Sequence, residues 1–110
     1  MKNLIYRIGK KLVKISNKEQ IIPVEFNNRD KEIFDYVVNE KLTMTSPQDI
    51  VTTILCAKHV AANQMKGDFV ECGVWRGGNI IAAKLIFDEM NHRAKIYLYD
   101  TFTGMTEPTD

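Results

Sequence analysis

Apolar residues in the first twenty positions recur every three or four residues, and basic residues occupy many of the positions between them. The apolar positions that share one helical face are Leu4, Ile5, Ile8, Leu12 and Ile15. This spacing predicts a basic amphipathic helix. Residues 18–29, which contain Pro23 and two asparagines, show no lasting period and are expected to form a connector.

Two further helices are predicted before the chain changes character. The first covers about 30–41 and places Ile33, Phe34, Val37 and Val38 on one face. The second begins at Ser46, because serine can cap a helix, Pro47 suits the first helical position and Asp49 can return the capping hydrogen bond. Gly67 is expected to end this helix as a left-handed terminator.

The last third of the chain reads as strand, helix, strand. Residues 68–72 are short, β-branched and aromatic, residues 79–90 are largely apolar at helical length, and residues 95–100 form a second strand-like run. Apolar residues occupy so much of the circumference of the helix predicted over 79–90 that it must contact more than one neighbour. One parallel βαβ unit follows from this order, so the fold class is α/β, with N-terminal helices preceding the unit.

Composition limits the class of protein. The chain has 110 residues, of which 45% are hydrophobic and 26% charged, as in an ordinary globular domain. The net charge of +1 argues against a nucleic-acid partner, and the longest apolar run is too short to span a membrane.

The charge is nevertheless unevenly distributed. Residues 1–20 carry six basic groups and one acidic group, a balance of +5, whereas the rest of the chain has a balance of −4. Contact of residues 1–20 with a membrane surface is one interpretation. We favour the alternative, in which the apolar stripe packs on the rest of the protein or on a second copy in a homo-oligomer.

Cysteine, histidine and lysine positions suggest structural roles. Cys56 and Cys72 lie in apolar contexts and are expected to be reduced and buried, which suits a cytoplasmic protein. Lys58 is expected to face solvent. No metal site is predicted, because neither His59 nor His92 has a partner at ligand spacing.

The residues that carry chemistry follow the two predicted strands. Glu71 and the turn Gly73–Gly78 end the first strand, and Asp100 ends the second. Ligands of open α/β sheets bind outside the carboxyl ends of the strands. A carboxylate at the second strand end can accept hydrogen bonds from both ribose hydroxyls, and a glycine turn lets a ligand approach bare backbone. The arrangement predicts an adenosine-containing cofactor.

The spacing of the glycines discriminates between cofactors. Gly73 and Gly78 match the outer glycines of a dinucleotide fingerprint, but Trp75 occupies the middle position and would obstruct a diphosphate. Glu71 would repel phosphate and favour an ammonium group. S-adenosyl-L-methionine is therefore favoured over NAD, and an NAD-dependent oxidoreductase stays as the weaker alternative.

Two segments resemble the macrocin O-methyltransferase family: residues 68–78, which read DFVECGVWRGG, and residues 98–105, which read LYDTFTGM. The loop Thr43–Ser46 is also similar. The resemblance implies a class I, Rossmann-like three-layer fold that transfers a methyl group from S-adenosyl-L-methionine to a hydroxyl, expected on a sugar. The implied cofactor-binding residues are Met44, Thr45, Glu71, Gly73, Trp75, Gly77, Gly78, Asp100, Thr101 and Phe102.

The resemblance also implies that some of the machinery lies outside these residues. Magnesium is expected in the family, but its aspartate ligands and the catalytic base would lie downstream, so no catalytic residue is assigned. We expect residues 1–29 to form a basic segment and connector, and residues 30–110 the N-terminal part of a truncated methyltransferase domain that is inactive alone. The alternative is a non-catalytic binding or assembly module derived from a methyltransferase.

Overall fold

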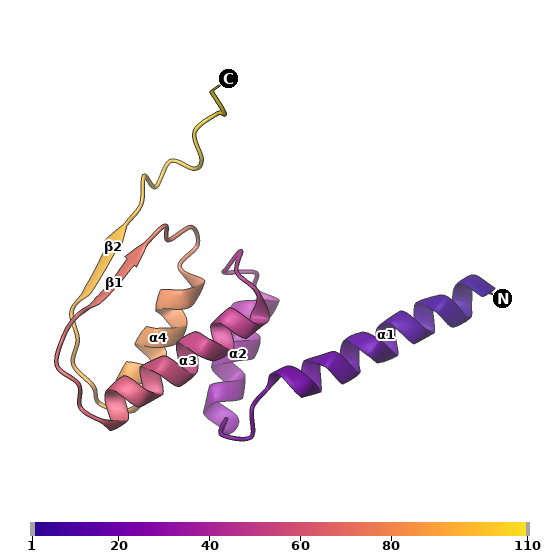
Figure 1. Cartoon of the computed structure of the whole chain (residues 1–110), viewed down its shortest axis with the longest axis horizontal. Coiled ribbons are helices and arrows are strands. Elements are labelled where there is room, and N and C mark those ends of the chain that lie inside the picture. The colour runs from indigo at the N-terminus through magenta and orange to yellow at the C-terminus, as the bar shows by residue number, and fades with distance from the viewer. Residues whose placement is uncertain (1, 110) are drawn as a thin grey trace.

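The computed structural model describes residues 2–109, with the backbone alone described for residues 2 and 14–21. Within these residues the elements are α1 (Lys2–Ile21), α2 (Asn28–Asn39), α3 (Pro47–Ala62), β1 (Phe69–Cys72), α4 (Gly78–Glu89) and β2 (Ile96–Tyr99). Helices α2, α3 and α4 lie together beside the two strands, whereas α1 extends away from them (Figure 1).

The two strands confirm the predicted βαβ unit and the α/β class. β1 and β2 are parallel, with Phe69 opposite Ile96 and Cys72 opposite Tyr99, and α4 connects them. Side chains alternate along β1, so Phe69 turns towards the helices and meets Phe87 edge-on at 6.2 Å between ring centroids. Val70 and Tyr97 turn to the opposite face and are exposed. The described residues therefore form two layers, with helices on one face of the sheet, rather than the three expected.

The hydrophobic core lies between α2, α3 and α4. Its most deeply buried large side chains are Phe34, Ile33, Ile50, Ile54, Ile86 and Val37. α4 contributes Ala82 and Ala83, both fully buried, which let it approach α2 and α3 closely. The prediction that this helix contacts more than one neighbour is confirmed.

Capping boxes start α2 and α3. At α3 the Ser46 hydroxyl accepts the Asp49 N–H, and the Asp49 carboxylate accepts the Ser46 N–H at 2.9 Å, as predicted. The same exchange between Asn27 and Asp30, with both bonds at 2.9 Å, starts α2 at Asn28. That helix therefore begins two residues before the predicted start.

The helix ends differ from the prediction. α3 ends at Ala62, and Gly67 lies in the loop beyond it. The left-handed position belongs to Gln64, with φ of 48°, whose N–H donates to Ala61 while the next N–H donates to Val60. Lys41 and Asn91 end α2 and α4 in the same way. A Schellman motif without glycine thus terminates each of these three helices.

Three residues lie in other environments than expected. Cys56 and Cys72 are free but exposed, because Cys56 faces away from the core side of α3 and Cys72 lies on the uncovered face of β1. Lys58 does not simply face solvent. It is paired with the buried carboxylate of Asp30 and links α3 to the start of α2.

Helix α1 forms as predicted but continues to Ile21, so residues 18–21 are helical and not part of the predicted connector. None of its described side chains joins the hydrophobic core. Every residue from 3 to 13 is exposed, and the predicted stripe residues Leu4, Ile5, Ile8 and Leu12 are all at least half exposed. The side chain of Ile15 lies outside the described residues. Among the helices that the structure describes, none has the length and apolar character that crossing a membrane requires.

Candidate functional site

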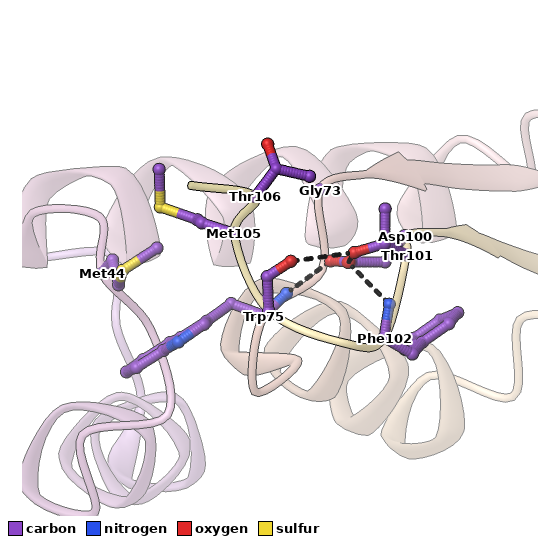
Figure 2. Close-up of a pocket in the computed structure, with 9 residues that line it drawn as sticks. Met44, Gly73, Trp75, Asp100, Thr101, Phe102, Met105 and Thr106 are labelled. Atoms are coloured by element: carbon purple, nitrogen blue, oxygen red, sulfur yellow. Dashed lines mark hydrogen bonds between the residues drawn. The ribbon is translucent and has the colours of Figure 1, made fainter. Parts of the chain in front are cut away.

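A cavity of about 540 Å³ lies at the carboxyl ends of β1 and β2. It is lined by Met44, Gly73, Trp75, Asp100, Thr101, Phe102, Gly104, Met105 and Thr106 (Figure 2). The first six of these were predicted as cofactor-binding residues. The parallel register brings the segments after the two strands side by side, with Gly73 donating its N–H to the carbonyl of Tyr99 at 2.8 Å.

Asp100 connects the two strand ends. Its Oδ2 accepts the N–H groups of Val74 at 2.6 Å and Trp75 at 3.0 Å, and its Oδ1 accepts that of Phe102 at 3.0 Å. These backbone hydrogen bonds, led by that from Phe102, lower the pKa of Asp100 to about 2. The group is therefore an anion at neutral pH, held by the loops on both sides.

The Oδ1 atom of Asp100 keeps room for another donor. The hydroxyl of Thr101 lies 3.4 Å from it but only 3.1 Å from the carbonyl of Gly104. A hydroxyl has one hydrogen to donate, and the carbonyl is the nearer acceptor. An incoming hydroxyl group can thus reach Oδ1 without displacing a backbone donor.

The loop after β1 is open on the cavity side. Gly73 has φ of +81°, and no atom lies within 4 Å of the position a Cβ would occupy there. Trp75 adopts φ of 48°, which is unusual for an aromatic residue, and its N–H bond to Asp100 supports that conformation. Its indole extends from the loop towards Met44 and away from Asp100, as Figure 2 shows.

Glu71 does not line this cavity. It lies on the helix-facing side of β1, two residues before Gly73, where burial raises the pKa of its carboxyl group and a hydrogen bond with the Asn79 side chain partly opposes that shift. Its Oε2 atom is buried and has no hydrogen-bond partner. A buried carboxylate oxygen without a donor is costly, so this atom is a candidate to receive one from a ligand.

Two of the predicted glycines act in packing instead of lining the cavity. Gly77 has φ of 80° and caps α4. The N–H of Gly78 donates to the carbonyl of Leu42 at 2.8 Å, and a Cβ on Gly78 would lie 2.6 Å from that oxygen. These glycines bring the start of α4 against the loop that carries Met44.

Thr45 also lies outside the cavity lining. Its N–H and hydroxyl both contact the hydroxyl of Thr43, at 3.0 and 2.8 Å, which shapes the turn before α3. Through that turn, Thr45 supports the neighbouring Met44 without facing the cavity.

Sequence reasoning missed Gly104, Met105 and Thr106 as cavity residues. They lie beyond β2, where no periodic pattern indicates an orientation. Their proximity to the second strand end was the only signal available. Nothing in residues 2–109 groups three or more histidine, cysteine, aspartate or glutamate side chains closely enough to hold a metal ion.

Comparisons with known proteins give a consistent result. A family model described as macrocin-O-methyltransferase (TylF) matches residues 4–110. An 8-demethyl-8-(2,3-dimethoxy-alpha-L-rhamnosyl)-tetracenomycin-C 4'-O-methyltransferase of Streptomyces olivaceus is 38% identical over 53 residues, which cover 47% of this chain and 20% of that protein. The matched segment thus spans about a fifth of the relative's length. No solved structure matches the chain significantly.

Proposed function

The chain belongs to the macrocin-O-methyltransferase family, and from that membership we propose that it binds S-adenosyl-L-methionine at the strand-end cavity. It would serve as the cofactor-binding part of an O-methyltransferase. The proposed acceptor is a hydroxyl group of a sugar, a class to which the rhamnosyl group in the relative's name also belongs. The βαβ unit would form the start of a class I, Rossmann-like sheet.

One observation carries the proposal: the motifs that follow β1 and β2 converge on one cavity. Gly73 and Trp75 come from the first motif, and Asp100, Thr101 and Phe102 come from the second. A site at the carboxyl ends of adjacent parallel strands is where α/β proteins bind their ligands. Its volume also falls within the range of small-molecule sites.

The charges suit the two ends of this cofactor. Asp100 is ionised, and its Oδ1 can accept a ribose hydroxyl in addition to its backbone donors. Glu71 offers Oε2, a buried acceptor without a partner, to the ammonium group of the methionine moiety. A diphosphate would meet the Asp100 carboxylate and no cationic side chain among the cavity-lining residues.

When bound, the cofactor supplies an electrophilic methyl group on a positively charged sulfur. The methyl group would pass from this sulfur to the acceptor oxygen, with the sulfur released as a neutral thioether and the hydroxyl proton taken up by a base. In this step the open backbone at Gly73 admits the ligand, and the two carboxylates orient it. The described residues contain no cluster of side chains that could hold the magnesium ion expected of the family.

Isothermal titration calorimetry on the 110-residue chain tests the proposal. S-adenosyl-L-methionine should give a saturable heat, and NAD should give none. Glu71→Gln should weaken cofactor binding by about tenfold, because it removes a charge-assisted hydrogen bond to the ammonium group. Glu25→Gln, a matched change at an exposed carboxylate, should leave binding unchanged.

Two outcomes would contradict the proposal. Heat with NAD alone would favour the oxidoreductase. Equal affinities for the Glu71→Gln and Glu25→Gln variants would remove Glu71 from the cofactor site.

A further inference from the structure

Helix α1 presents an apolar stripe that the rest of the described chain does not cover. Leu4, Ile8 and Leu12 recur at four-residue intervals, with exposed fractions of 60%, 50% and 61%, and Ile5 beside them is 67% exposed. Residues spaced in this way lie on one side of a helix. Figure 1 shows that this part of α1 lies far from the core helices. The stripe therefore needs a partner outside the described fold.

Cationic side chains run along the same half of the helix. Arg7 and Lys11 are exposed, and helical spacing places them beside one edge of the apolar stripe. On the opposite face, the Lys10 ammonium lies 5.3 Å from the centre of the Tyr6 ring. Residues 1–20 contain six basic groups and one acidic group in total. α1 thus combines apolar contact area with concentrated positive charge.

The charge identifies the occupant. A second copy of α1 would cover the stripe but would bring two strongly positive helices together. The acidic remainder of the chain has the right sign, yet it leaves residues 3–13 exposed. An anionic lipid surface matches both the apolar stripe and the positive charge of α1. Apolar side chains can insert below its headgroups, and cationic side chains can contact the headgroups themselves.

We infer that α1 docks the protein on anionic membranes, lying in the plane of the bilayer interface. Leu4, Ile8 and Leu12 enter the boundary between headgroups and acyl chains, and Arg7 and Lys11 contact the anionic headgroups. Each cationic side chain near such a surface strengthens partitioning by about fivefold. The inference rests on α1 alone and is independent of the proposed cofactor site.

Vesicle co-sedimentation of the 110-residue chain tests the inference. The protein should pellet with vesicles of phosphatidylcholine and phosphatidylglycerol and stay in the supernatant with phosphatidylcholine alone. Binding should weaken as salt rises, because salt screens exposed charges. Arg7→Gln/Lys11→Gln should lower partitioning by about twenty-five-fold, as two such contributions multiply. Leu4→Ser/Ile8→Ser/Leu12→Ser should abolish it.

The control variant removes the same charge from the folded part of the chain. Lys31→Gln/Lys66→Gln changes two exposed lysines outside α1 and should pellet like the unmodified protein. If it loses binding as strongly as the α1 variant, attraction is nonspecific and the inference fails. Failure to pellet with anionic vesicles also overturns it. Self-association in analytical ultracentrifugation without vesicle binding would overturn it in favour of a second copy.

Discussion

The carboxylate of Asp100 accepts the backbone N–H of Val74 at 2.6 Å across 26 positions of sequence. This bond joins the end of β2 to the loop that follows β1, and the neighbouring N–H of Trp75 strengthens the connection. Because the same carboxylate also accepts the N–H of Phe102, it holds together the loop after β1 and the segment after β2. Asp100 thus shapes the site in which we propose that it also holds the ribose.

The first prediction concerns the stability of the protein at acid pH. The pKa of Asp100 falls from 3.8 to about 2 in the folded protein. Its contribution to stability is therefore complete above about pH 4 and declines as pH falls towards 2. Asp100→Asn should remove that part of the acid dependence. Urea unfolding at several pH values between 2 and 5 measures this effect. The difference in the free energy of unfolding between the unmodified protein and the variant should shrink as pH falls.

The control for this measurement is Glu25→Gln, which alters an exposed carboxylate distant in sequence from the loop. Its unfolding curve should track that of the unmodified protein across the same pH range. A difference between Asp100→Asn and the unmodified protein that stays constant from pH 5 to pH 2 would show that the carboxylate does not titrate in this way.

Local sequence patterns accounted for most of the secondary structure. The apolar spacing of α2, the Ser46 and Asp49 pair at the start of α3 and the β-branched run of β1 each act through neighbours in the chain. The parallel pairing of β1 and β2 follows from the connecting helix between them. These features are encoded within a few residues of where they appear.

Features without a recognisable sequence marker, and features that depend on distant segments, were not predictable in the same way. Gln64 takes the left-handed position because its N–H and the next reach back to carbonyls of α3, and no glycine marks it. The packing role of Gly78 depends on the carbonyl of Leu42, which lies on another loop. Similarly, the spacing of Glu71 and Asp100 indicated a shared edge of the sheet but not that only Asp100 lines the cavity.

A second prediction separates stability from binding at Glu71. Burial raises the pKa of this carboxyl group, so the folded protein holds its proton to higher pH than the unfolded chain does. The ionised group therefore lowers stability at neutral pH, and this effect disappears as pH falls through the raised pKa. Glu71→Gln should raise the melting temperature at pH 7 and gain nothing at pH 3. Thermal unfolding at both pH values measures the change in melting temperature. A melting temperature at pH 7 lower than that of the unmodified protein would contradict the prediction.

A third prediction tests the close approach at Gly78. Gly78→Ala would place a methyl group 2.6 Å from the carbonyl oxygen of Leu42 and 2.8 Å from the Cβ of Thr43. Because backbone atoms cannot move aside easily, the free energy of unfolding should fall by about 1–3 kcal/mol. Gly9→Ala adds the same methyl group in α1 with no atom within 4 Å and should leave the core transition unchanged. Equal melting temperatures for the two variants would contradict the proposed contact.

The last prediction concerns the pair of Lys58 and Asp30. Asp30 is only 2% exposed, and its carboxylate pairs with the Lys58 ammonium and accepts the N–H of Asn27. Lys58→Met leaves this buried carboxylate without its cation and should lower the free energy of unfolding by about 1–3 kcal/mol. Lys84→Met breaks the corresponding contact with exposed Asp88 and should change it by less than about 0.5 kcal/mol. Adding Asp30→Asn to Lys58→Met should recover part of the loss, because a neutral amide can stay buried and still accept the Asn27 N–H. Chemical unfolding of the four proteins measures these differences. A double variant less stable than Lys58→Met would show that Asp30 acts through its cap alone and not through its charge.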